Sequence, residues 1–185
     1  MTVEPDGDDL PREGGHLPAA APAGLLTDDV RRVVAEQRLG FVATVCPDGT
    51  PNPPPKGTVA VWDDRHLVFA DLRSPRTVRN LRHNPAVEVN VVDPVARSGY
   101  RFKGEGSVIT SGPLFERAVR FFAQDGVSDA RRRIRAVVVV AVHHASPLVS
   151  PAYDLGPSEQ EVRARWQRHY QGLREAWHAT ASSGS

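Results

Sequence analysis

The chain has 185 residues, of which 23 are lysine or arginine and 22 are aspartate or glutamate, so its formal net charge is only +1. This length suits one domain, and a charge so close to zero creates no overall field that favours nucleic acid or an anionic membrane. Cys46 is the single cysteine, which excludes an internal disulfide and fits a reducing, cytoplasmic location. No apolar run approaches the roughly 20 residues of a membrane span, and the acidic start is unlike a signal peptide.

The two ends of the chain differ from its middle. Residues 1–24 are rich in Pro, Gly, Ala and Asp and lack an apolar period, so we expect a disordered lead. Residues 25–178 carry the predicted helices and strands and form the expected domain. Residues 179–185 are small and mostly polar, and we expect a flexible tail.

The first half of the domain predicts a helix followed by three strands. Thr27 can cap a helix whose first turn is acidic. Strands are expected at 41–45, around 57–62 and at 66–70, with a tight Asp-Gly turn after the first. Prolines before the second strand cannot donate to a ladder, so its approach is an edge or an extended lead-in.

The second half begins with a helix that opens at Pro75, and two strands follow. In the strand at 100–109, Gly104 and Gly106 suggest a bulge or a close backbone approach. The other elements are a strand at 86–92, a helix at 112–126, the strongest strand at 134–144 and a last helix from Ser158, with Ser158 and Glu161 as its capping box. Because most connections are short and hairpin-like, an antiparallel sheet or barrel with peripheral helices fits better than a doubly wound parallel sheet.

The stretch "FADLRSPRTVRNLRHNP" joins a strand to a helix through Ser74 and Pro75, which read as the N-cap and the first helical residue. This helix start offers free N–H groups, the positive end of the helix dipole, the Thr77 hydroxyl and the Arg76 guanidinium. Those are the ingredients of a phosphate site. Arg79 and Arg82 lie one and two turns further along and are rotated about the helix axis, so they cannot bind the same phosphate. The residues alone leave two interpretations: a phosphate site at 73–77, or a capped helix with solvated arginines.

A second candidate anion site lies in "PNPPPKGT", where Lys56 follows an inflexible proline run and Gly57 allows close approach of a ligand. The alternative is a proline and lysine pair that protects a sheet edge. The "RRR" run at 131–133 is short and lacks interleaved aromatics, so we interpret it as a solvated loop rather than a nucleic-acid site. His143 and His144 point to opposite faces of a strand, and with one cysteine no metal site is expected.

With these residues in view, the chain resembles the pyridoxamine 5'-phosphate oxidase-like family of FMN-binding split barrels. The resemblance runs from about Leu39 to Val108. It depends on three segments in order, "LGFVATVCPDGTPNPPPKGT", "LVFADLRSPRTVRNLRHNP" and "GYRFKGEG". A later segment, "PLVSPAYDLGPSEQEVRARW", is similar to the tail of one bacterial branch.

The resemblance implies a mainly β fold with α, a six-stranded antiparallel split β-barrel with peripheral helices. It also implies a homodimer with two FMN sites at the subunit interface. The residues that it assigns to the cofactor are Arg73, Ser74, Arg76 and Thr77 for the phosphate, Ala70 and Asp71 for the ribityl chain or ring, Lys56, Gly57 and Thr58 for the isoalloxazine, and Tyr100 and Arg101 from a later strand.

The activity that the resemblance implies is an FMN-dependent oxidoreductase acting on a small molecule. Relatives also use a deazaflavin coenzyme, and a non-enzymatic flavin or haem protein on the same barrel is the remaining alternative. The authentic pyridoxamine phosphate oxidases end in an Arg-x-His segment that holds their substrate. Arg168 and His169 are adjacent here rather than spaced by one, so the resemblance does not extend to that activity. No residue stands out as a catalytic acid or base.

Overall fold

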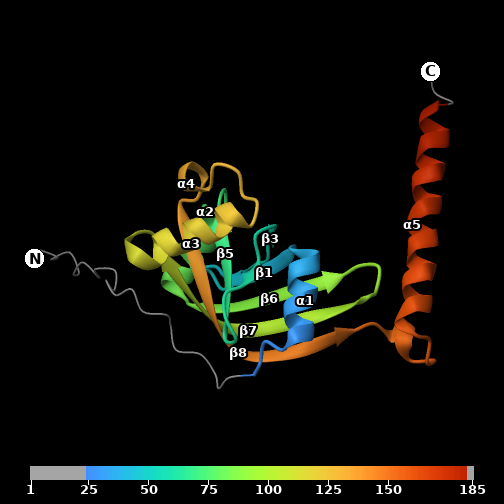
Figure 1. Cartoon of the computed structure of the whole chain (residues 1–185), viewed down its shortest axis with the longest axis horizontal. Helices are drawn as coiled ribbons and strands as arrows, with labels where there is room; N and C mark the ends of the chain where they lie inside the picture. The colour runs from blue at the N-terminus through green and yellow to red at the C-terminus, as the bar shows by residue number, and fades with distance from the viewer. Residues whose placement is uncertain (1–23, 183–185) are drawn as a thin grey trace, which may run out of the picture.

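The computed structural model describes residues 24–182, and side chains as far as residue 178. The predicted lead, except its last residue, and the last three residues lie outside this range. In chain order (Figure 1) the elements are α1 Asp28–Gln37, β1 Gly40–Val45, β2 Pro51–Asn52, β3 Pro55–Lys56, β4 Ala60–Val61, β5 His66–Asp71, α2 Pro75–His83, β6 Ala86–Asp93, β7 Ser98–Ile109, α3 Gly112–Gln124, α4 Ala130–Arg133, β8 Ala136–Val149, the 3-10 turn η1 Pro151–Tyr153 and α5 Glu159–Ser182.

One antiparallel sheet organises the chain, with strand order β2-β1-β6-β7-β8-β5-β4 and β3 paired to β1. The mainly β antiparallel fold with helices is therefore confirmed. The structure has eight strands where six were expected, because the proline-rich lead-in forms two short strands, β2 and β3, before the strand expected around 57–62, which is β4. β3 pairs with β1 at one edge of the sheet, and β4 pairs with β5 at the other. Since only residues 57–59 connect them, the two edges of the sheet lie close together and the sheet curves strongly.

The main core fills the concave side of this sheet. Valines of β1, β6 and β8 pack there with Phe69 and Phe102, and α1 adds its three buried valines. Leu81 of α2 enters the same core, so α1 and α2 both cover the inner face. Burial of these side chains supplies the stabilising free energy that fixes both helices on the sheet.

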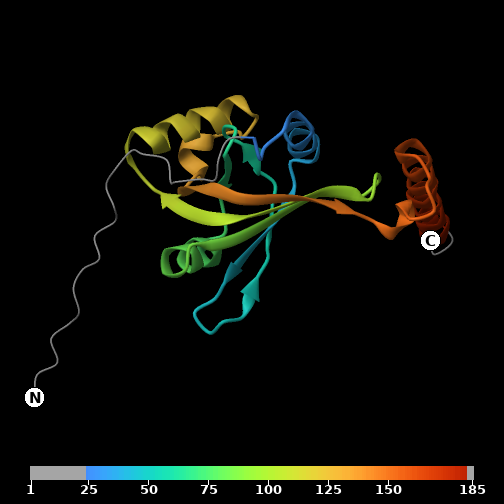
Figure 2. The ribbon, with the colours of Figure 1, turned by 90° about the horizontal axis from the view of Figure 1, so that it is seen from below.

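A second core lies on the opposite face of β5 and β8. There α3 contributes Ala118, Val119 and Phe122, which pack against Val137 and Val139. This explains why β8 is buried on both faces as far as Val142, as its apolar sequence predicted. Figure 2 shows α1 and α3 over the strands, with α5 standing apart at the far end.

Capping residues in the sequence correctly predicted the starts of α1 and α5. The Thr27 hydroxyl accepts from the Val30 N–H, and Ser158 and Glu161 form the predicted capping box. The bulge expected near Gly104 is present as a register shift between Lys103 and Gly104. One prediction was wrong: the arginines at 131–133 lie in the short helix α4 rather than in a loop, although they are exposed.

Within residues 24–182, no helix is long and apolar enough to cross a membrane. The same residues include no group of three or more His, Cys, Asp or Glu side chains that could hold a metal ion.

Candidate functional site

Lys56 is the least exposed cation of the site, with 4% of its surface accessible. It ends β3, where it pairs with Gly40 of β1, and its side chain is buried. Its Nζ donates a hydrogen bond of 2.6 Å to the Ser74 hydroxyl. Burial lowers the pKa of Lys56, and the charge of Asp71 opposes this shift. The sequence thus places a desolvated ammonium beside the start of α2.

The start of α2 has no side-chain cap. Ser74 occupies the N-cap position before Pro75, but its hydroxyl makes no capping hydrogen bond. Its backbone N–H donates to Asp71 Oδ1 at 2.6 Å, so the turn after β5 is held from the strand side. A helix start without a cap leaves N–H groups that can bind an anion, and the helix dipole favours negative charge there.

Thr77 carries a buried hydroxyl with no hydrogen-bond partner among the described residues, and the residue is 1% exposed. One turn further, Asn80 Nδ2 donates to Thr44 Oγ1 at 3.0 Å and contacts Cys46 Sγ at 3.4 Å. Of the two buried polar side chains of α2, Asn80 is therefore paired and Thr77 is not. A buried hydroxyl without a partner is costly unless a ligand completes it.

Arg76 lies exposed on the first turn of α2. Hydrogen bonds from Thr50 hold the pKa of Asp48 below its ordinary value, and the charge of Arg76 adds to this. Arg76 is thus close to the turn between β1 and β2. We call Lys56, Ser74, Arg76 and Thr77 the α2 cradle.

The other predicted residues near the α2 cradle serve the backbone around it. The Thr58 hydroxyl accepts from the Ala70 N–H at 3.0 Å, which ties the lead-in of β4 to the end of β5. Asp71 is buried and holds Ser74, as described above. Gly57 and Arg73 are exposed beside these contacts.

Tyr100 and Arg101 are engaged elsewhere. The Tyr100 hydroxyl donates to Asp29 of α1 at 2.5 Å, and this bond is the main reason why the pKa of Asp29 is lowered. Arg101 projects from the opposite face of β7, where its Nε lies 3.1 Å from Glu88 Oε1. Successive residues of a strand point to opposite faces, so the two cannot serve one side of the sheet.

Sequence reasoning missed the polar residues behind the α2 cradle, Thr44 and Asn80. Asn80 follows Thr77 by three residues and shares its helix face, which was a usable signal. Concavities of about 590 and 690 Å³ lie elsewhere, at the base of α5 and between α3 and α4, and no residue of the α2 cradle lines either.

The family model described as pyridoxamine 5'-phosphate oxidase matches residues 26–147, which is well over half of the chain. The chain belongs to this family. The match contains β1 to β7, the α2 cradle and nearly all of β8, and it stops before α5. The family recognised from the three sequence segments is therefore confirmed.

Solved structures agree with the membership in the pyridoxamine 5'-phosphate oxidase family. HupZ from Group A Streptococcus is similar at 30% identity with a TM-score of 0.60, covering 67% of this chain and 94% of that one. An FMN-binding protein from Syntrophomonas wolfei shares the fold at 16% identity, TM-score 0.56, covering 68% and 87%. An F420 reductase shares it at 24% identity, TM-score 0.51, covering 65% and 98%. None of the curated proteins matches the chain significantly.

Proposed function

We propose that the chain is an FMN-dependent oxidoreductase that acts on a small molecule and holds the flavin phosphate in the α2 cradle. The observation that carries this proposal is the meeting of the buried Lys56 Nζ with Ser74 at an uncapped helix start. The orphaned Thr77 hydroxyl lies on the same helix turn. Membership in the family and the FMN-binding neighbour support flavin as the phosphate-bearing group.

The residues present fit a phosphate. An ammonium, two hydroxyls, a guanidinium and free backbone N–H groups are the donors that bind phosphate oxygens. Asp71 would repel the phosphate. However, one of its carboxylate oxygens accepts a hydrogen bond from the Ser74 N–H, and the positive charge of Lys56 offsets the charge of the carboxylate. The desolvated Lys56 gains most from an anion, because an incoming charge replaces the hydration that burial removed.

Lys56 belongs with the phosphate rather than with the flavin ring in this proposal. Its Nζ is 2.6 Å from Ser74, a residue that the family resemblance assigns to the phosphate. When bound, FMN supplies hydride or single-electron transfer between a donor and an acceptor. The residues of this chain bind and orient it, and the α2 cradle fixes one end.

We also propose that the protein is a cytoplasmic homodimer with the cofactor at the subunit interface. Arg76 of the α2 cradle is exposed, and no cradle residue lines either of the two concavities, so we expect a second wall for the flavin ring to come from another chain. Pockets that bind cofactors usually enclose most of the ligand surface.

The first test is the absorbance spectrum of the protein as isolated, followed by titration with FMN and with riboflavin. We expect FMN to bind about 100-fold more tightly than riboflavin, because two or more charge-assisted hydrogen bonds to the phosphate contribute about 1.5–3 kcal/mol each before losses on binding. Equal affinities would contradict the α2 cradle. Selective binding of a deazaflavin coenzyme would favour the chemistry of the F420 reductase neighbour, and a Soret band would favour haem.

Replacement of Thr77 by valine should have opposite effects on stability and on binding. Valine has nearly the shape of threonine and removes a buried hydroxyl without a partner, so the free energy of unfolding should rise by about 1 kcal/mol. FMN affinity should fall about 10-fold, because one hydrogen bond to the phosphate is lost. Urea unfolding and fluorescence titration measure the two effects.

Thr44→Val is the matched control for this experiment. The Thr44 hydroxyl accepts from Asn80, so its loss should lower stability and leave the preference for FMN over riboflavin unchanged. If Thr77→Val lowered stability in the same way, Thr77 would be a structural residue.

A further inference from the structure

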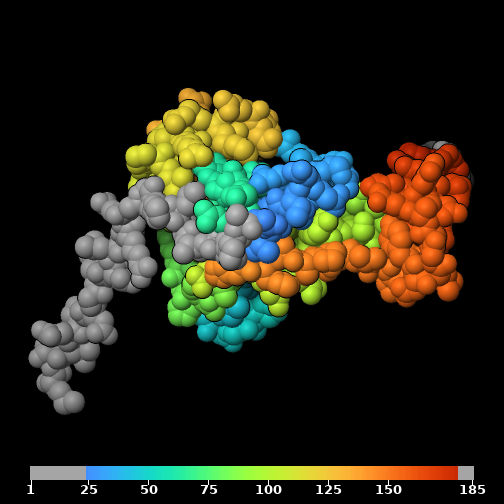
Figure 3. Space-filling model, turned by 60° about the horizontal axis from the view of Figure 1, so that its bottom comes forward, coloured from blue at the N-terminus to red at the C-terminus, as the bar shows by residue number. Residues whose placement is uncertain are grey.

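A concavity of about 690 Å³ lies between α3 and residues 127–132, the segment that contains α4. In Figures 1 and 3, α3 and α4 (yellow to orange) lie together on one side of the molecule, away from α5. We call this concavity the α3–α4 groove, and no residue of the α2 cradle lines it. Its volume falls within the range of roughly 300–1,000 Å³ that is typical of pockets for small molecules.

One face of α3 forms the first wall of the groove. The lining residues of this helix are spaced by three, one and three positions, which places them on a single stripe facing α4. They are Glu116, Val119, Arg120 and Ala123. Val119 belongs to the second core and is 4% exposed, so this wall is anchored to the sheet.

The second wall is made where the chain reverses direction after α3. Gly126 has a φ of +92°, which glycine adopts without strain. The Val127 N–H donates to the Phe122 carbonyl at 2.9 Å, and the Ile134 N–H donates to the Ala130 carbonyl at 2.9 Å. Ala130 and Ile134 are buried in the second core. Because both ends of this segment are fixed, the groove is preformed and little ordering is required for binding.

Both walls contribute apolar side chains to the groove. Val119 and Ala123 come from α3, and Val127 and Ala130 come from the opposite wall. Val127 is half-buried and Ala123 is exposed. An aliphatic chain that covers these side chains removes apolar surface from water, which favours binding. A small inorganic ion would gain nothing from this part of the groove.

The charged lining of the groove consists of three arginines and two carboxylates, so its formal net charge is +1. Arg131 is ion-paired with Glu116. The hydrogen bond from Arg131 lowers the pKa of Glu116, and the charge of Arg120 adds to this shift. Arg120 and Arg132 are exposed, and neither forms an ion pair with any residue that the structure describes. The groove therefore offers free guanidinium donors beside an apolar surface.

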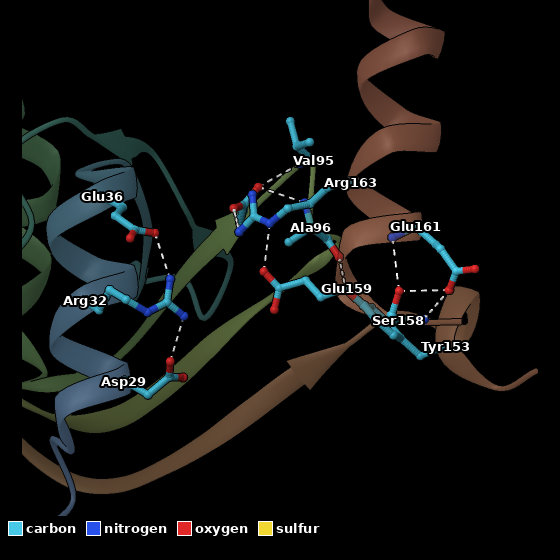
Figure 4. A network of polar contacts seen from close by, with 11 residues as sticks. Asp29, Arg32, Glu36, Val95, Ala96, Tyr153, Ser158, Glu159, Glu161 and Arg163 are labelled. Carbon is cyan, nitrogen blue, oxygen red and sulfur yellow. Dashed lines mark hydrogen bonds and ion pairs between the residues drawn. The ribbon is translucent and has the colours of Figure 1, made fainter. Parts of the chain in front are cut away.

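Arginines elsewhere in the molecule are paired more completely. In the network of Figure 4, Arg32 lies 2.7 Å from Asp29 and 2.9 Å from Glu36, and Arg163 lies 2.7 Å from Glu159. Each of these guanidinium groups is neutralised by carboxylates of its own chain. Within the described residues, the α3–α4 groove has one ion pair for three arginines, which leaves room for a carboxylate from outside.

We propose that the α3–α4 groove binds a small alkyl carboxylate. Its chain lies on the apolar side chains of both walls, and its carboxylate pairs with Arg120 and Arg132. A guanidinium matches a carboxylate because it donates two parallel N–H hydrogen bonds. Glu116 competes for the same arginines and limits the affinity. The site is separate from the α2 cradle and does not require a bound flavin.

Isothermal titration calorimetry of the full chain with decanoate tests the proposal. Decanoate should bind with a dissociation constant below about 1 mM, which is ordinary for a ligand of this size. Octanoate should bind about 10-fold more weakly, because two methylene groups no longer leave water. Decyltrimethylammonium has the same chain and the opposite charge, so it should bind at least about 10-fold more weakly than decanoate.

Three variants and one control assign the contacts. Arg120→Gln should weaken decanoate binding about fivefold, and Glu116→Gln should strengthen it about threefold because it frees Arg131. Ala123→Glu places a carboxylate on the apolar surface and should weaken binding more than about 10-fold. Arg133→Gln removes an exposed charge from α4 outside the groove and should leave the affinity unchanged. Circular dichroism confirms that each variant is folded.

Four results would overturn the proposal. Decanoate may not bind at millimolar concentration, or its affinity may equal that of octanoate, which would reduce the contact to a surface ion pair. Arg133→Gln could weaken binding as much as Arg120→Gln, which would show a general attraction between charges. Displacement of decanoate by saturating FMN would assign the carboxylate to the α2 cradle. Absence of FMN binding, with decanoate binding still dependent on Arg120, would instead remove the proposed function and support the groove.

Discussion

Lys56→Met should lower FMN affinity about 100-fold and leave the thermal stability of the ligand-free protein unchanged or higher. A charge-assisted hydrogen bond to a phosphate contributes up to about 3 kcal/mol, and each 1.4 kcal/mol is about tenfold in affinity. Methionine fills nearly the same volume without a buried charge, so the desolvation cost of the ammonium disappears. Asp71 keeps its hydrogen bond from the Ser74 N–H in the variant.

The measurement is a titration of the wild type and of Lys56→Met with FMN and with riboflavin, together with thermal unfolding of each protein. Riboflavin lacks the phosphate, so its affinity should change little. Lys103, the other lysine of the chain, is an exposed partner of Glu88 and provides the control. Lys103→Met should leave the ratio of FMN to riboflavin affinity unchanged. An equal loss of FMN and riboflavin binding in Lys56→Met would instead assign Lys56 to the flavin ring.

The lowered pKa of Lys56 also fixes the direction of the pH dependence. Phosphate binds the protonated amine, so FMN affinity should fall as pH rises through this lowered pKa, and the fall should be absent in Lys56→Met. For the free protein, the unfolded chain binds this proton more tightly than the folded one. Stability should therefore increase with pH between the folded pKa and the ordinary value of 10.5.

The sequence predicted the parts of this site but not their meeting. Ser74 before Pro75 marks a helix start through local sterics and hydrogen bonding, which a short segment contains in full. Lys56 appeared as a separate feature, because its contact with Ser74 joins residues 18 apart through the curvature of the sheet. That curvature depends on β3 and β4, two short strands that are separated only by residues 57–59 and pair with opposite sheet edges. Such pairing is a long-range property that no local pattern reports.

Tyr100 and Arg101 are a case in which a local rule of strand geometry was not applied. Both were assigned to the cofactor by resemblance, yet neighbours on a strand alternate between faces, and this rule was available from the sequence. The structure engages Tyr100 with α1 and Arg101 with Glu88 on the other side. Their place in the cofactor site stays a prediction.

Gly104→Ala should lower the free energy of unfolding by about 3 kcal/mol or more, which is a large share of the 5–15 kcal/mol that holds an ordinary domain folded. Gly104 lies at the bulge where the pairing of β7 with β8 shifts register. A Cβ at this position would collide with the carbonyl oxygen of Ala141 and stand 2.9 Å from its carbonyl carbon. These are backbone atoms of the buried first half of β8, so relief requires that the β7–β8 pairing give way.

Two other glycines separate this mechanism from a general effect of alanine. At Gly106 a Cβ would meet side-chain atoms of Leu81 and Val138 at 3.0–3.3 Å, and flexible side chains can yield, so we expect a loss of about 1 kcal/mol. At Gly172 in α5 a Cβ would meet nothing within 4 Å, and alanine should stabilise the exposed helix by up to about 1 kcal/mol. The urea concentration at the unfolding midpoint should be highest for Gly172→Ala, followed by the wild type and Gly106→Ala, and lowest for Gly104→Ala. A Gly104→Ala midpoint at or above that of Gly106→Ala would show that the bulge can move away from Ala141 at little cost.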